Sequence, residues 1–265
     1  MQNMKNHYLI FILLNVFATM PQCLAKLIRV PQDYSTIQIA INESKDGDAI
    51  ILARGIYAGS IDLKGKGLTL RSDYSGDVPS KEDIEQTVVE GQVDGRPVLT
   101  LNGGAVKIVG FTVRGGTAGG IYQTAGTASQ LEYMLVQGAK GNGIDTYYGG
   151  SMSVDRCVVE KCQGQGIYSF CTQINIRRSE VRQNLQNGVH VYGHCGEKLQ
   201  IQDSIIRDTV GHGVSNGYSV MGLIVNCTIV NNKGFGVGSG FGVVVRNTIL
   251  WSNGRQISDG TVDVD

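Results

Sequence analysis

Apolar and polar positions recur along this chain at a regular interval. A glycine followed by isoleucine or valine returns at steps of 23, 23, 22, 25 and 23 residues. The glycines are Gly120, Gly143, Gly166, Gly188, Gly213 and Gly236. Self-similarity at a nearly fixed spacing of this length is the signature of a repeat architecture. We therefore expect each repeat to build one rung of a stacked structure.

A second segment runs in step with the glycines and places its apolar residues in a fixed order. Its first, third and eighth residues are apolar and its sixth is mostly small, in segments 106–113, 152–159, 174–181, 199–206, 223–230 and 243–250. Alternation of this kind predicts two short strands joined by a bend. The segments between the strands lack helical periodicity, which excludes a strand–helix–strand unit. We expect three short strands in each rung.

The stacking of these short strands decides the fold class. Parallel strands lie roughly 4.8 Å apart, and each rung buries its inward residues on the rung before it. Connections between parallel strands are overwhelmingly right-handed. The predicted fold is therefore all-β, a single-stranded right-handed parallel β-helix of about nine or ten rungs. The repeated segments resemble the pectin-lyase-like superfamily of right-handed β-helix repeat proteins over nearly all of residues 26–265.

The N-terminal part of the chain differs from the repeats. Residues 1–25 are expected to be a signal peptide, because Lys5 precedes an apolar run and Cys23 to Ala25 suit signal-peptidase cleavage. We therefore expect a secreted, periplasmic or cell-surface protein with no membrane contact after cleavage. Its single domain would contain an N-terminal cap with the first rungs (26–71), an irregular surface loop (72–97) and the regular repeats (98–265).

A short helix is predicted in the N-terminal cap. Segment 35–38 has the spacing of a capping box, and Ile37, Ala40 and Ile41 form an apolar stripe. We expect a helix from about Thr36 to Ser44 that covers the open strand edges of the first rung. No such lid is predicted at the C-terminal end, where we expect self-association.

The charge balance argues against several partners. The chain carries 23 basic and 23 acidic side chains, which give a formal net charge of +0 at pH 7. A balanced charge gives no reason to expect nucleic acid or an anionic membrane as partner. The cysteines lack the Cys-x-x-Cys spacing of zinc sites. We expect no cofactor and no metal.

Five cysteines follow the predicted signal peptide. Cys171 and Cys195 lie at nearly the same register one rung apart, where stacking would bring their Cα atoms to roughly 5 Å, within disulfide range. The oxidising environment of an exported protein would allow this pair to form a disulfide. Cys157 falls at the small inward position of its rung, so we expect a buried free thiol there.

The outward positions of the glycine-containing strands carry most of the aromatic side chains. The residue after each Gly-Ile or Gly-Val step points outward, as does the residue two positions later. An aromatic strip with polar groups suits sugars, whose C–H faces stack on rings while their hydroxyls bind polar groups. We therefore predict a polysaccharide partner. The expected substrate-binding residues are Tyr122, Tyr147, Phe170, Tyr192 and, at the edge, Tyr218.

Two alternatives to simple glycan binding stay open. A uronate polysaccharide lyase or epimerase needs a base and a group that neutralises the substrate's charge. The candidate catalytic residues are Tyr168 or His190 as base and Asp145 as orienting group, but no Lys or Arg occupies these columns. The other alternative is a non-catalytic structural or adhesion module, in which the aromatic ladder only stabilises stacked rungs.

One sequence motif matches an enzyme family by itself. Gly211-His212-Gly213 has the form of the Gly-His-Gly motif of polygalacturonases. It falls on the Gly-x-Gly step of the repeat, and the paired aspartates of that family are missing. We therefore interpret the match as coincidence.

An apolar column is predicted beside the bend between the two repeated strands. If it is exposed it predicts a partner surface, and if the bend turns it inward it belongs to the core. The pattern leaves both open. Its residues are Leu135, Val158, Ile205, Ile229 and Ile249.

Overall fold

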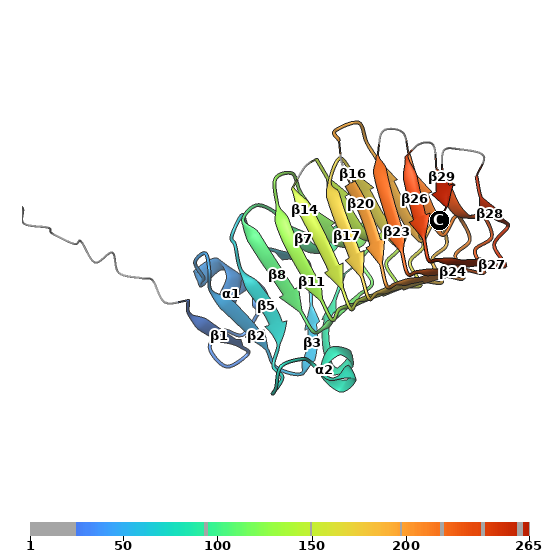
Figure 1. Cartoon of the computed structure of the whole chain (residues 1–265). Helices are drawn as coiled ribbons and strands as arrows, with labels where there is room; N and C mark the ends of the chain where they lie inside the picture. The colour runs from blue at the N-terminus through green and yellow to red at the C-terminus, as the bar shows by residue number, and fades with distance from the viewer. Residues whose placement is uncertain are drawn as a thin grey trace, which may run out of the picture.

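The computed structural model describes residues 25–92, 95–148, 150–196, 198–217, 220–239, 242–258 and 262–264. They form one elongated coil in which the strands of successive rungs lie side by side (Figure 1). Residues 1–24 of the predicted signal peptide and Tyr218 lie outside the described residues. Among the described residues, no helix has the length and apolar character needed to cross a membrane.

The described strands form three sheets of 11, 9 and 9 strands, and each regular rung gives one strand to each sheet. Sheet A contains β1 (Leu27–Val30), β2 (Ala49–Leu52), β5 (Thr69–Ser72), β8 (Ala105–Val109), β11 (Ala128–Glu132), β14 (Ser151–Asp155), β17 (Gln173–Arg177), β20 (Lys198–Gln202), β23 (Met221–Val225), β26 (Val243–Arg246) and β29 (Val262–Val264). Sheet B contains β3 (Gly55–Ala58), β6 (Thr87–Glu90), β9 (Thr112–Arg114), β12 (Leu135–Gln137), β15 (Val158–Glu160), β18 (Glu180–Arg182), β21 (Ile205–Arg207), β24 (Thr228–Val230) and β27 (Ile249–Trp251). Sheet C contains β4 (Ile61–Asp62), β7 (Pro97–Leu101), β10 (Gly119–Gln123), β13 (Asn142–Tyr147), β16 (Ile167–Phe170), β19 (Val189–Tyr192), β22 (Val214–Asn216), β25 (Phe235–Ser239) and β28 (Arg255–Ile257).

The core follows the axis of the coil and is built from the predicted inward positions. In one rung, Met152, Val154, Cys157 and Val159 are all buried. Parallel pairing places Ile174 of the next rung beside Met152, so equivalent side chains stack from rung to rung. Each fully buried aliphatic side chain contributes about 1.5–3 kcal/mol. The predicted parallel β-helix with three strands in each rung is confirmed.

One rung is shifted by a residue from the predicted segment 223–230. Its inward residues are Gly222, Ile224 and Ile229, so Ile229 belongs to the core and its assignment to the predicted column beside the bend is wrong. Leu223, Ile224 and Val225 are all apolar, and alternation alone therefore does not set their register.

The apolar column beside the bend lies on the surface. Thr228 takes the place predicted for Ile229 and pairs with Ile205 on one side and Ile249 on the other. The side chains of Ile205 and Ile249 are 42% and 62% exposed. The core interpretation of this column is therefore wrong.

A single residue in the left-handed region turns the chain from sheet A to sheet B in each regular rung. Arg178 and Asn226 hold this position with φ of 47° and 55°. This conformation costs an L-residue about 1–2 kcal/mol. Hydrogen bonds between rungs offset part of that cost, because Arg178 Nε donates to Asp155 Oδ1 at 2.8 Å and Asn226 Nδ2 donates to Asp203 Oδ1 at 3.0 Å.

Buried amides hold the next bend, from sheet B to sheet C. Asn184 Oδ1 accepts the Cys162 N–H at 3.0 Å, and its Nδ2 donates to the Val159 carbonyl at 3.3 Å. Asn232 and Asn253 occupy equivalent places in later rungs and are also buried. Each asparagine thus satisfies backbone groups of the preceding rung that the bend leaves unpaired.

Helix α1 (Ile37–Glu43) covers the N-terminal end of the coil, as predicted (Figure 1). Its apolar stripe is buried, and the helix contacts β1, β2 and β4. The N-cap is Thr36, whose Oγ1 accepts the Ile39 N–H at 3.2 Å, so the capping box predicted at segment 35–38 is wrong. Gln38 instead uses its side-chain amide to bind the backbone N–H and carbonyl of Asp62 in β4.

Helix α2 (Lys81–Gln86) lies in a segment for which the sequence predicts an irregular loop. Ser80 Oγ accepts the Asp83 N–H at 3.1 Å, and the Asp83 carboxylate accepts the Ser80 N–H at 2.9 Å. This reciprocal capping box starts the helix. Arg54, from an earlier rung, donates to Asp83 at 2.9 Å and so ties the helix to the coil.

Candidate functional site

The outward side chains of sheet C form one surface along the coil. The register pairs Tyr122 with Asp145, Asp145 with Tyr168, and Tyr168 with His190. A second column pairs Tyr147 with Phe170, and Phe170 with Tyr192. We call this surface the aromatic face. It brings together seven residues that the sequence singles out, and their roles in binding or catalysis stay predictions: Tyr122, Asp145, Tyr147, Tyr168, Phe170, His190 and Tyr192.

Ring contacts run along the aromatic face from rung to rung. Tyr168 and His190 stack with ring centroids 5.5 Å apart and an interplanar angle of 15°. Phe170 and Tyr192 stack at 5.8 Å and 21°. Tyr147 contacts the Tyr168 ring at 5.5 Å. Tyr192 remains 37% exposed, so the rings that stabilise the rungs also present apolar surface to a ligand.

A ladder of polar side chains lies beside the aromatic face, at the central residue of the Gly-x-Gly steps and its equivalents. Asn142 Oδ1 accepts the Gln165 N–H at 2.7 Å, and Gln165 Oε1 accepts the Asn187 N–H at 2.9 Å. Asn187 Oδ1 accepts the His212 N–H at 2.7 Å, and His212 Nδ1 accepts the Phe235 N–H at 2.8 Å. We call Asn142, Gln165, Asn187 and His212 the polar ladder. Each member uses its acceptor atom on the backbone of the next rung.

The polar ladder orients two residues of the aromatic face. Because its oxygens are engaged, the amide NH₂ groups are left to donate. Asn142 Nδ2 donates to Asp145 Oδ1 at 2.6 Å, and Asn187 Nδ2 lies 3.1 Å from His190 Nδ1. An NH₂ donor needs an acceptor, so the neutral His190 ring carries its proton on Nε2. Asp145 is thereby held as an acceptor and His190 as a donor, on either side of Tyr168.

Burial shifts the pKa values of the face. Asp145 is 7% exposed, and burial raises the pKa of its carboxyl to about 6, although the hydrogen bond from Asn142 opposes this shift. Burial, with a smaller contribution from the Asp145 charge, raises the pKa of Tyr147 to about 12 and also raises that of Tyr168. Burial lowers the pKa of His190, and nearby His212 adds to this shift. Among the described residues, no Lys or Arg contributes to these shifts.

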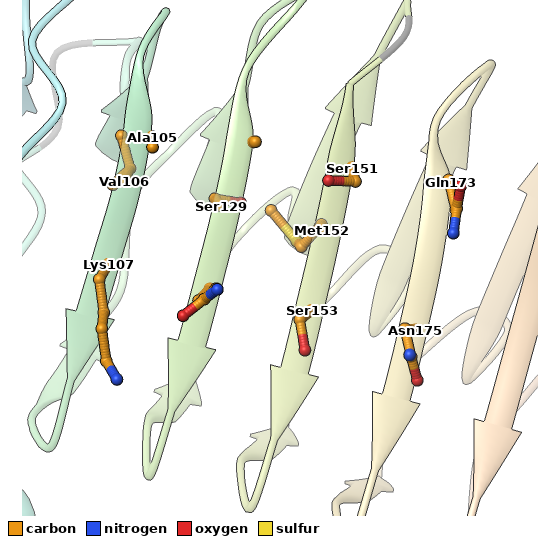
Figure 2. A pocket seen from close by; sticks show the side chains of 11 residues that line it. Ala105, Val106, Lys107, Ser129, Ser151, Met152, Ser153, Gln173 and Asn175 are labelled. Carbon is orange, nitrogen blue, oxygen red and sulfur yellow. The ribbon is translucent and has the colours of Figure 1, made fainter.

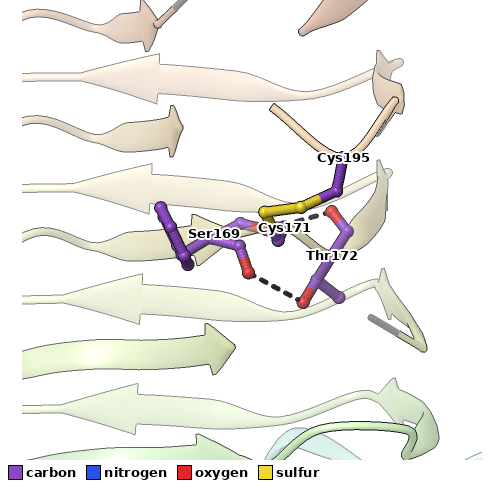
Figure 3. The surroundings of a disulfide bond; sticks show 5 residues. Ser169, Cys171, Thr172 and Cys195 are labelled. Carbon is purple, nitrogen blue, oxygen red and sulfur yellow. Dashed lines mark hydrogen bonds between the residues drawn. A yellow bond between two sulfur atoms is a disulfide. The ribbon is translucent and has the colours of Figure 1, made fainter. Parts of the chain in front are cut away.

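A disulfide closes the edge of the aromatic face. Cys171 directly follows Phe170 and is bonded to Cys195, with their Cα atoms 5.4 Å apart (Figure 3). This is the pair that rung stacking predicts. Tyr192 lies in the same rung as Cys195, so the bond joins the two rungs that carry Phe170 and Tyr192 at the turn into sheet A.

The polar ladder is the part of the site that the sequence interpretation misses. In the sequence, the polar ladder is marked by a hydrogen-bond acceptor side chain that recurs at the centre of the Gly-x-Gly steps, as at Asn142 and Gln165. The side chain of His212 accepts the Phe235 N–H, which gives it a structural role within the repeat. That role agrees with the interpretation of Gly211-His212-Gly213 as a feature of the repeat.

Hollow surfaces lie away from the centre of the aromatic face. A groove of about 330 Å³ follows sheet A, lined mainly by small and amide side chains of β8, β11, β14 and β17, together with Lys107 (Figure 2). A groove of about 530 Å³ lies between α2 and sheet B. A third hollow of about 450 Å³ borders Tyr148 and the disulfide. The described part of the chain contains no group of three or more His, Cys, Asp or Glu suited to a metal ion.

Comparisons with known proteins agree with this architecture. The family model described as "Right handed beta helix region" matches residues 75–204. A comparison with curated proteins finds no match.

Several solved structures share the fold. Pectate lyase Pel9A is 12% identical, with a TM-score of 0.64 over 91% of this chain and 78% of that chain. Polygalacturonase from Erwinia carotovora ssp. carotovora is 14% identical, with a TM-score of 0.53 over 91% and 84%. Alginate lyase from Paenibacillus sp. str. FPU-7 is 14% identical, with a TM-score of 0.52 over 90% and 99%. At these identities the likeness shows the fold alone, and these neighbours are proteins that act on polysaccharides.

Proposed function

We propose that this chain, a right-handed parallel β-helix protein of the pectin-lyase-like superfamily, is exported and binds an extracellular polysaccharide along its aromatic face. The observation that carries the proposal is the column of Tyr147, Phe170 and Tyr192 on three successive rungs. Sugar rings would stack on this column, while their hydroxyls bind Asp145 and His190 beside it. The polysaccharide-acting neighbours of the fold support the same class of ligand.

Binding is tested by screening the purified protein against a panel of polysaccharides and measuring affinity by calorimetry. Tyr168→Ala and Tyr192→Ala each remove one ring, and we expect affinity to fall about tenfold for each. Trp251→Ala is the matched control, because Trp251 is 71% exposed on sheet B, outside the aromatic face. An intact fold that binds no glycan would instead favour the structural or adhesion module.

A second candidate is a uronate polysaccharide lyase or epimerase. The observation that favours it is the stack of Tyr168 on His190 with Asp145 on the adjacent rung, which brings two candidate bases and a carboxyl together on one surface. Here Tyr168 or His190 would remove the proton α to the substrate carboxylate, and Asp145 would orient the substrate.

The enzyme candidate is tested with pectate, alginate and related uronate polymers. A lyase produces an unsaturated sugar whose ultraviolet absorbance rises with time, and an epimerase changes the sugar composition. Activity that is lost in both Tyr168→Phe and His190→Gln, but kept in Trp251→Ala, would support this candidate. No unsaturated and no epimerised product would exclude it.

A further inference from the structure

The charge of the aromatic face bears on the class of glycan that it accepts. Asp145 is the only acidic residue among its seven residues, and none of them is Lys or Arg. The Asp145 carboxylate accepts its hydrogen bond from the uncharged amide of Asn142, which does not neutralise it. The face therefore carries an uncompensated negative charge whenever Asp145 is ionised.

The protonation states of the neighbouring groups add no positive charge at neutral pH. The pKa of Asp145 is about 6, so its carboxyl is ionised above neutral pH. Burial lowers the pKa values of His190 and His212 from the ordinary value of histidine, which favours the neutral form of both rings. Tyr147 and Tyr168 keep their protons because their pKa values are raised. A ligand at slightly alkaline pH thus meets one anion and several neutral groups.

The hydrogen-bonding pattern matches hydroxyl groups. Asp145 accepts, and His190 in its Nε2–H form donates, one on each side of the Tyr168 ring. A sugar hydroxyl both donates and accepts, so it can bind either group. A uronate carboxylate only accepts, and it therefore gains no hydrogen bond from Asp145 and is repelled by it.

We propose that the aromatic face selects uncharged polysaccharides over uronate polymers, with Asp145 as the residue that excludes the carboxylate. This inference rests on the proposed function, since it concerns the same face. A like charge about 5 Å away on a partly buried surface lowers affinity by roughly tenfold or more at low ionic strength. The uronate substrate of the second candidate would meet the same repulsion.

The test uses pairs of polymers that share one backbone and differ at the primary hydroxyl, which is replaced by a carboxylate in one form. Neutral polysaccharides that bind are oxidised at their primary hydroxyls to carboxylates, and both forms are titrated into the full protein at pH 8 and low salt. We expect the oxidised form to bind about tenfold more weakly or worse. Added salt should reduce this difference only in part, because the buried Asp145 carboxylate is screened less than an exposed charge.

The Asp145→Asn variant identifies the residue responsible. Asparagine keeps an oxygen that can accept the hydrogen bond from Asn142 but removes the negative charge, so the difference in affinity between the neutral and the oxidised polymer should largely disappear. Asp203→Asn is the matched control, because Asp203 is exposed at the bend between sheets A and B. This variant should leave the difference in affinity between the neutral and the oxidised polymer unchanged.

The outcomes separate this inference from the proposed function. Oxidised polymers that bind as tightly as neutral ones, or binding to uronate polymers alone, would overturn the selectivity and leave polysaccharide binding in place. Discrimination that persists in Asp145→Asn would also overturn it. A protein that binds neither polymer form would overturn both proposals.

Discussion

The burial of the Asp145 carboxyl lowers the stability of the folded protein at neutral pH. Among the described residues, only Asn142 offsets this burial through a hydrogen bond, and the pKa of Asp145 in the folded protein is about 6 against 3.8 in a model peptide. Between these two values the folded state holds more protons than the unfolded state. Stability therefore falls as pH rises from about 4 to about 6 and stays reduced above that range.

Replacement of this carboxyl by a neutral isostere tests the argument. Asp145→Asn should increase the free energy of unfolding at pH 7.5 by about 1–3 kcal/mol, since each pKa unit corresponds to about 1.4 kcal/mol. At pH 4 the variant and the wild type should be nearly equal. Denaturant titrations at both pH values measure the difference, and a variant that is less stable at pH 7.5 would contradict the argument.

At this scale the sequence predicts some of the site and misses the rest. The columns that contain Tyr168 and His190 follow from the repeat alone, because equivalent positions in successive rungs must become neighbours. The bonds from Asn142 and Asn187 are not visible in a hydrophobic pattern, because they join a side chain to the backbone of the next rung. Only the recurrence of acceptor side chains at these positions signals them.

At the scale of elements, α2 is the clearest failure of sequence interpretation. Its six residues include a single buried one, Asp83, so no apolar stripe reveals the helix. The cap at Ser80 and the ion pair with Arg54 hold it instead, and Arg54 is remote in sequence. Helix α1 is predictable because its apolar stripe packs on the first rung.

The bend between sheets B and C gives a prediction at the same scale. Asn232 is buried, its Oδ1 accepts from the Thr209 N–H at 3.1 Å, and its Nδ2 donates to the Ile206 carbonyl at 3.3 Å. Asn232→Ala leaves these backbone groups unpaired, so we expect the free energy of unfolding to fall by about 2–4 kcal/mol. Denaturant unfolding followed by circular dichroism measures the loss.

A surface amide provides the comparison for this variant. Asn175→Ala changes an outward, half-buried residue of sheet A and should alter stability by less than about 0.5 kcal/mol. Equal losses in Asn175→Ala and Asn232→Ala would show that the bend does not depend on its buried amide.

At the scale of the whole molecule, the coil is predictable because one rule is applied many times. Each rung repeats the same inward positions. A wrong register predicted for one rung, as at Ile224, therefore does not change the predicted architecture. Contacts link mainly neighbouring rungs, so stability is close to a sum of rung and interface contributions. Local covalent links should therefore act locally.

The disulfide joins two neighbouring rungs and gives a prediction about the stability of the whole molecule. Cys171 and Cys195 are 24 positions apart, and a crosslink over a loop of this length typically stabilises a fold by about 3 kcal/mol. Replacing both by serine should lower the free energy of unfolding by about this amount. Reductant should lower the stability of the wild type to the same level and leave the variant unaffected. A variant as stable as the oxidised wild type would contradict this expectation.

The free cysteines of the described residues have a practical consequence. Cys157, Cys162 and Cys227 are all buried, and burial raises the pKa of each thiol, so they are unreactive in the intact coil. An alkylating reagent reaches each sulfur only when its own stretch of coil opens. The order in which the three sulfurs are labelled under mild denaturant therefore shows which part of the coil unfolds first. Early labelling of Cys157 and Cys162 would indicate the middle rungs, and early labelling of Cys227 the rungs nearer the C-terminal end.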